Sequence, residues 1–164
     1  MAESIHPNAA KVVAAAKKYA DQKYTEGPNN DTVFGKSYGM NHQPWCAMFV
    51  SGCFADAGVV HLVAASTKKG FASCDAGAQW FAKNKRIVPI GQAQAGDIVF
   101  FNFDKKPTDT EHVGIVVKND GKNLHCYEGN TSGDSKGSQA NGDGVFLKKR
   151  AYSLVMSVAR PDWD

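Results

Sequence analysis

The sequence predicts an α+β fold in which helices come first and an antiparallel sheet follows. Apolar residues recur with a helical period in the first half of the chain and form short strand-like runs after Gly96. The strand-like runs are joined by turns and loops without helices, which favours antiparallel pairing over parallel βαβ units. With 164 residues, the chain is expected to form a single domain that covers residues 1–164.

Three helices are expected in the first half of the chain. The first covers about residues 8–22, with Asn8 as its cap and an apolar face on one side. The second covers about 45–58 and ends at a glycine, and the third covers about 73–84 and begins at a serine cap. Residues 25–44 contain many turn formers, so this stretch is expected to be irregular.

Five strands are expected after Gly96, and they lie at about residues 97–101, 112–117, 124–130, 145–149 and 154–160. A hairpin turn at 119–122 is expected to join the second and third of these strands. The stretch 129–144 is rich in glycine and serine and is expected to be a long loop.

Composition excludes several classes of protein. Hydrophobic residues make up 43% of the chain and charged residues 21%, which is typical of a globular protein. A net charge of +3 is too weakly basic to indicate nucleic-acid binding. Because no apolar run approaches about 18 residues, we expect no membrane span. No signal peptide is visible at the N-terminus, so synthesis in the cytoplasm is expected.

Of the four cysteines, Cys46 is the candidate nucleophile. The four show no CxxC pair, so free thiols are expected and neither a zinc ribbon nor a disulfide framework. Cys46 is expected at a helix N-terminus, which stabilises a thiolate and offers N–H groups to an oxyanion. A small core residue is the alternative. Cys53 and Cys126 are expected in the core, and Cys74 starts a helix without the turn that precedes Cys46.

His112 is the candidate general base because it begins a rigid strand. Glu128 and Asn130 are two residues apart on the next strand, so they project from one face. Counting back from the turn places His112 near Glu128, which could then fix the tautomer of the imidazole. Gly114 has no side chain and would let another element approach closely. His42 and His125 are weaker candidates, since one lies in a loop and the other faces away from Glu128.

Three segments together resemble the CHAP family of cysteine peptidases and amidases: Pro44–Ser51, Glu111–Val116 and Glu128–Ser132. The resemblance extends over about residues 24–160. It implies a papain-like α+β fold, with the helices packed on a twisted antiparallel sheet. It also implies hydrolysis of amide bonds in peptidoglycan.

The resemblance also implies roles for four residues. Cys46 is the nucleophile, His112 acts as general base and then as general acid, and Glu128 orients His112. Asn130 is similar to an auxiliary member of the same site. Around these residues, Gln43 precedes the nucleophile and is expected to donate to the oxyanion. Two aromatic residues, Trp45 and Tyr38, are candidates for lining a substrate groove, with core packing as the alternative.

No cofactor and no metal are expected. Some members of the family hold calcium in an Asp-rich loop before the nucleophile, whereas residues 29–34 here contain a single carboxylate. Calcium requires six to eight oxygen ligands. No separate wall-binding domain is expected within the chain, so such a domain or subunit is a possible partner. The basic run Lys148–Arg150 is expected to be a solvated strand end rather than a binding patch.

Other functions stay open at this point. A Cys-His-Glu amidase or deamidase could act on a protein or on a small thiol conjugate, and a binding module could keep the fold without catalysis. Within the peptidoglycan hydrolases, Phe34-Gly35, Tyr38-Gly39 and Arg160-Pro161 resemble phage endolysins, and a toxin delivered by a secretion system is the alternative. Action on the cell wall after release or delivery is expected. The bond that is cut stays open.

Overall fold

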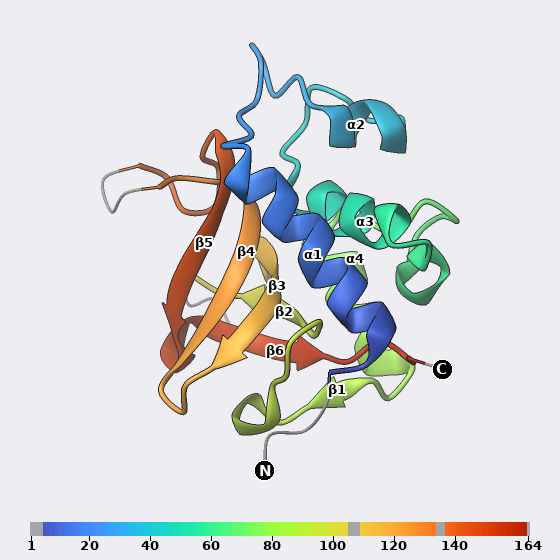
Figure 1. Cartoon of the computed structure of the whole chain (residues 1–164), viewed down its shortest axis with the longest axis vertical. Coiled ribbons are helices and arrows are strands. Elements are labelled where there is room, and N and C mark those ends of the chain that lie inside the picture. Colours follow the sequence, from blue (N-terminus) through green and yellow to red (C-terminus); the bar gives the residue numbers. More distant parts are fainter. Residues whose placement is uncertain (1–4, 105–108, 134–136, 164) are drawn as a thin grey trace.

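The computed structural model describes residues 5–104, 109–133 and 137–163, which form helices packed on one sheet (Figure 1). The α-helices are α1 (Pro7–Asp21), α2 (Val33–Tyr38), α3 (Cys46–Asp56) and α4 (Cys74–Lys83). The strands are β1 (Ile87–Val88), β2 (Ile98–Phe101), β3 (His112–Asn119), β4 (Asn123–Thr131), β5 (Gly144–Ala151) and β6 (Val155–Ala159). Short 3₁₀ turns lie at Val60–Val63, Ile90–Gln92 and Tyr152–Leu154.

The six strands form one sheet in the order β1-β6-β2-β3-β4-β5, and every neighbouring pair is antiparallel. The predicted turn joins β3 to β4 as a hairpin, because Asp120 accepts hydrogen bonds from the backbone N–H groups of Lys122 and Asn123. Helices first and an antiparallel sheet afterwards is the α+β class that the sequence predicts, and the structure confirms it.

Helix α3 is the centre of the core, because eight of its eleven residues are buried. It packs against β3 and β4 on one face of the sheet and against α1 and α2 on its other sides, and Figure 1 shows α1 and α3 running on the same side of the strands. A second, smaller cluster covers the other face of the sheet, and it includes Val99, Phe101, Val116, Leu124 and Cys126. The sheet is therefore packed on both faces.

The three predicted helices are confirmed, with one change at the first cap. The side chain of His6, not Asn8, caps α1, since its Nδ1 accepts from the backbone N–H of Asn8. Pro7 is then the first helical residue, a position where its missing N–H costs nothing. Gly58, which follows the C-cap residue Ala57 of α3, has a positive φ of 79°, in agreement with the predicted stop.

Besides the two-residue edge strand β1 and the short 3₁₀ turns, which were not predicted from the sequence, two further features of the fold were not expected. Residues 25–44 contain the short helix α2, which Thr32 caps through a hydrogen bond from Gly35 and which ends at Gly39 with a φ of 92°. Six residues are too few for a helical period to be visible in the sequence. The predicted loop 129–144 begins later than expected, because β4 continues to Thr131, and its residues 134–136 lie outside the described part of the chain. Among the described helices, none is long and apolar enough to cross a membrane.

Candidate active site

Cys46 is the first residue of α3, as predicted, and its sulfur lies where the helix presents unpaired amide groups. The preceding residue, Trp45, gives the helix no side-chain cap. The backbone N–H of Ala47, the next residue, helps to lower the pKa of the Cys46 thiol. The residue is 6% exposed, so the thiol is almost enclosed. A thiolate here is stabilised by the partial positive charge of the helix N-terminus.

His112 and Glu128 form a buried pair next to this thiol. Nε2 of His112 lies 2.8 Å from Oε1 of Glu128, and neither side chain is exposed to solvent. The other ring nitrogen, Nδ1, is buried and has no hydrogen-bond partner of ordinary length among the described residues. Nδ1 is therefore the nitrogen left to exchange a proton with Cys46.

The pairing of β3 with β4 explains why position 114 is a glycine. Ile115 pairs with Tyr127, which shifts the predicted register by two residues and places Glu128 beside Gly114. A Cβ at Gly114 would lie 2.7 Å from Cγ of Glu128. Glu128 therefore passes over Gly114 to reach His112, and any larger residue would displace the carboxylate. The close approach that the sequence predicts at Gly114 is confirmed.

Arg150 is a member of this cluster that the sequence did not predict. From β5 it donates to both oxygens of Glu128, with Nε 2.9 Å from Oε2 and Nη2 2.5 Å from Oε1. Its guanidinium lies over the rings of Phe101 and Phe103, 5.6 Å and 4.9 Å from their centroids. The same two rings pack against His112. The rings of Phe101 and Phe103 exclude water from the Glu128 carboxylate, which strengthens its charged hydrogen bonds.

The predicted basic run 148–150 is therefore not a solvated strand end. Because alternate residues of a strand face opposite sides, Arg150 turns inward while Lys149 stays exposed. Nζ of Lys148 donates to the carbonyl of Ser132. Only Lys149 of the three is exposed, so the run forms no continuous basic patch.

The protonation states in the cluster follow from these contacts. The Cys74 thiol and then the His112 imidazolium hold the pKa of Cys46 well below its ordinary value, although burial opposes them. Burial would lower the pKa of His112, but the neighbouring Cys46 thiolate and the hydrogen-bonded Glu128 carboxylate raise it to about 9. Burial likewise opposes ionisation of Glu128, but His112 and Arg150 keep its pKa below the usual value. These pKa shifts favour a Cys46 thiolate, a His112 imidazolium and a Glu128 carboxylate at neutral pH.

Cys74 lies unexpectedly close to the nucleophile. It is the first residue of α4, and its Sγ lies 3.6 Å from Sγ of Cys46. The hydrogen bond with Cys46 and then burial raise the pKa of Cys74 well above its ordinary value. The helix start was visible in the sequence, but the packing of α4 against the N-terminus of α3 was not.

The remaining predicted site residues lie outside the row formed by Cys46, His112 and Glu128. Trp45 is fully buried and stacks on Phe34 at 5.6 Å, so its side chain belongs to the core and the groove prediction does not fit it. Gln43 is exposed just before α3. Tyr38 is half-buried and lines a small hollow of about 160 Å³ beside α2 and α3.

Asn130 is fully buried, and within the described part of the chain its Oδ1 has no hydrogen-bond partner. Its backbone is left-handed, with a φ of 57°, at the irregularity where β4 pairs with β5. Its Nδ2 donates to the carbonyl of Ala140, so the amide is directed at the glycine-rich loop. An auxiliary role for Asn130 in catalysis stays a prediction.

The two weaker histidine candidates are engaged elsewhere. Nδ1 of His42 lies 2.9 Å from the carbonyl of Asn29 in an exposed loop. Nε2 of His125 lies 2.9 Å from Asp120, which closes the hairpin turn. His112 is therefore the histidine that the structure brings to Cys46.

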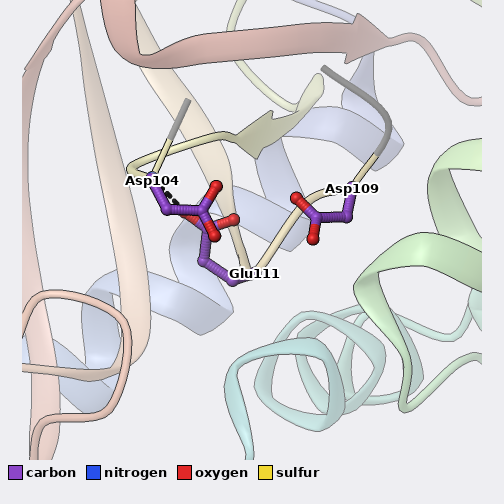
Figure 2. A group of neighbouring side chains, drawn as sticks. All are labelled: Asp104, Asp109 and Glu111. Carbon is purple, nitrogen blue, oxygen red and sulfur yellow. Dashed lines mark hydrogen bonds between the residues drawn. The ribbon is translucent and has the colours of Figure 1, made fainter. Parts of the chain in front are cut away.

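A group of carboxylates lies between β2 and β3, with Asp104 on the chain that follows β2 and Asp109 and Glu111 on the chain that precedes β3 (Figure 2). One oxygen each of Asp104, Asp109 and Glu111 lies within 4.8 Å of the others, which is a spacing that a cation could bridge. Oε1 of Glu111 already accepts from the backbone N–H groups of Phe103 and Asp104. Glu111 thus ties the chain before β3 to the chain that follows β2, and Asp104 is exposed.

The single carboxylate of the 29–34 stretch is also engaged by protein groups. Oδ1 of Asp31 accepts from Nδ2 of Asn41 at 2.7 Å and lies 3.3 Å from Nζ of Lys36. These contacts lower the pKa of Asp31, and they tie this loop to the segment before Cys46. Asp31 therefore has a structural role in this arrangement.

Comparison with family models gives a match to the CHAP domain over residues 37–130. Comparison with curated proteins gives no match. The matched stretch is more than half of the chain and contains Cys46, His112, Glu128 and Asn130. CHAP domains are hydrolase, amidase and peptidase domains. The order of the residues, the α+β fold and the family match lead to one conclusion: this chain belongs to the CHAP family.

Proposed function

We propose that this protein hydrolyses an amide bond of bacterial peptidoglycan through a thioester formed on Cys46. The observation that carries the proposal is a nearly enclosed cysteine at a helix N-terminus beside a fully buried His112–Glu128 pair. Nucleophilic catalysis requires such a pairing, because the reactive species is the thiolate. Peptidoglycan is the substrate class that the family resemblance implies.

The first half of the reaction is acyl transfer to sulfur. Proton transfer from Cys46 to Nδ1 of His112 precedes substrate binding, since the pKa of the thiol lies low and that of the imidazole near 9. The thiolate attacks the amide carbonyl, and the oxyanion binds the free N–H groups at the start of α3. The exposed side chain of Gln43 is the second donor in this proposal.

The second half returns the enzyme to its resting state. The His112 imidazolium gives its proton to the leaving amine, and the C–N bond breaks. His112 then takes a proton from water, whose oxygen attacks the thioester carbonyl and releases the acid and the thiolate. Glu128 holds the ring through Nε2 during both transfers, and Arg150 holds Glu128.

In the cell we propose an endolysin-like role, with lysis of the wall after release or delivery. Peptidoglycan is the proposed partner, and a wall-binding domain or subunit supplied separately would raise the local concentration of the enzyme on its substrate. This role rests on the family resemblance of the segments around Phe34, Tyr38 and Arg160.

Mass spectrometry of the fragments released from purified peptidoglycan tests the proposal and identifies the bond. New amino termini on stem or bridge peptides would show an endopeptidase. Glycan chains without stems, together with stem peptides that begin at L-alanine, would show a muramoyl–L-alanine amidase.

The matched control is Cys46→Ala, because alanine keeps the helix start and removes the sulfur. Release of the same fragments by this variant at the parent rate would overturn the proposal. If no wall type yields fragments that depend on Cys46, amide hydrolysis of a protein or of a small thiol conjugate replaces it.

A further inference from the structure

Two helix N-termini bring two thiols together at the active site. Cys46 begins α3 and Cys74 begins α4, and their sulfur atoms are 3.6 Å apart. This is the distance of a hydrogen bond between a thiol and a thiolate, and both side chains are more than nine-tenths enclosed by protein. Burial strengthens such a contact, because no water competes for the charged sulfur.

The surroundings decide which of the two sulfurs keeps its proton. Cys46 faces the His112 imidazolium and the Ala47 N–H, which both favour its thiolate. Cys74 faces the negative charges of Asp75 and Glu111, besides the Cys46 sulfur, and these favour its neutral thiol. Oδ1 of Asp75 accepts from the backbone N–H of Thr110, so this carboxylate is fixed in place. The proton of the pair therefore resides on Cys74.

We propose that Cys74 is a positioning residue whose S–H donates a hydrogen bond to the Cys46 thiolate. The proposal rests on the proposed function, since it gives the nucleophile a second stabilising partner besides His112. Pairs of thiols at one helix N-terminus are known to lower the pKa of the nucleophilic sulfur. Here the two thiols come from the N-termini of two different helices, α3 and α4, instead of from one helix.

The contact also has a use in the second half of the catalytic cycle, where it acts beside His112. After His112 has given its proton to the leaving amine, Cys46 is a thioester and the ring is neutral. When water breaks the thioester, the sulfur must depart as a thiolate, and a lower pKa makes it a better leaving group. The Cys74 thiol still carries its proton at that moment, so it stabilises the departing sulfur.

Alkylation of Cys46 by iodoacetamide as a function of pH tests the proposal directly. The protein is reduced beforehand, because two sulfurs this close can be oxidised to a disulfide. The rate is followed by mass spectrometry of the peptide that contains Cys46. Cys74→Ala is expected to raise the pH of half-maximal alkylation by about one unit, which is about a tenfold loss of thiolate below that pH. Cys74→Ser keeps a donor and is expected to restore most of the shift.

Three measurements make the test specific. Cys53→Ala removes a buried thiol two turns further along α3 and is expected to leave the midpoint unchanged. Thermal melts show whether each variant is folded. In the parent protein, Cys74 is expected to stay unreactive at pH values where Cys46 is fully alkylated.

The proposal is overturned if Cys74→Ala is folded and its Cys46 midpoint equals that of the parent. It is also overturned if Cys46 and Cys74 of the parent react with the same pH midpoint, a result that needs no variant at all. Because alkylation requires no peptidoglycan, these outcomes are independent of the fragment analysis. A failure of the proposed substrate would leave them unchanged.

Discussion

Two buried carboxylates in the described part of this protein each form an ion pair with an arginine, and only one of the two pairs lies at the active site. Glu128 accepts from Nε and Nη2 of Arg150 at 2.9 Å and 2.5 Å. Asp97 accepts from Nε and Nη2 of Arg160 at 3.0 Å and 2.9 Å. Both carboxylates are fully buried. By geometry alone, the two ion pairs are nearly equivalent.

The third partner of each carboxylate separates them. Glu128 also bonds His112, and the two cations hold the pKa of its carboxyl below the usual value. Asp97 bonds the backbone N–H of Gln94, and burial raises its pKa despite Arg160. One ion pair therefore orients an imidazole, whereas the other closes a turn before β2. In this protein, the ion pair at the active site is the one whose third partner, His112, can accept and donate a proton.

The largest loss of activity is expected on substitution of Cys46 or His112, the two residues that react with the substrate in the proposed mechanism. Cys46→Ala and His112→Asn should each lower kcat/KM on purified walls by about 10³-fold or more, because each removes a group that forms or transfers a bond. Turbidity clearing measures this loss. The control is Asp97→Asn, which should stay near the parent rate, and a His112 variant that is folded and fully active would contradict the mechanism.

Substitution of the two carboxylates, Glu128 and Asp97, is expected to have the next largest effects, one on kcat and the other on stability. Glu128→Gln should lower kcat by about 10²-fold, since the ring loses the charge that holds it as an imidazolium. Asp97→Ala should keep the kcat of the folded enzyme but lower the free energy of unfolding by about 3 kcal/mol, because Arg160 loses its buried partner. Urea denaturation and initial rates separate the two effects. Equal losses of kcat in both variants would refute the distinction.

The smallest effect is expected at the arginines. Arg150→Met keeps much of the packing on Phe101 and Phe103 but removes the charge, so kcat should fall about tenfold as Glu128 loses its second partner. Arg160→Met should leave kcat unchanged. Arg150→Lys tests whether a charge without the planar fork is enough, and we expect only partial recovery. A kcat for Arg150→Met equal to that of the parent would remove Arg150 from the account.

Short-range sequence patterns were sufficient to predict the site residues that lie at the ends of well-defined helices and strands. The helix start at Cys46, the strand start at His112 and the β3–β4 hairpin are short-range features, so their residues could be brought together by counting. The count was two residues off, because the hairpin pairs Asn119 with Leu124 and is thus centred later than residue 120. The irregularity after Val116 removes only one residue of this offset. The long side chain of Glu128 makes up the difference.

Arg150 and Cys74 could not be found this way, because both depend on contacts between distant segments. Arg150 reaches Glu128 only through the pairing of β5 with β4, across a long loop that hides the register. Strand alternation from Leu147 to Arg150 was a usable signal, but the run of three basic residues suggested a solvated end. Cys74 depends on how α4 docks beside α3, which no periodicity encodes.

The most direct test of the account is the pH profile of kcat/KM for the parent, Glu128→Gln and Asp97→Asn. Activity requires the thiolate and the imidazolium together, so it should rise as Cys46 loses its proton and fall near pH 9, where His112 loses its own. Because Glu128 raises the pKa of His112, its loss should move the alkaline limb to lower pH, and Asp97→Asn should leave the limb in place. An alkaline limb that Glu128→Gln leaves unmoved, or that both variants move equally, would contradict the central claim.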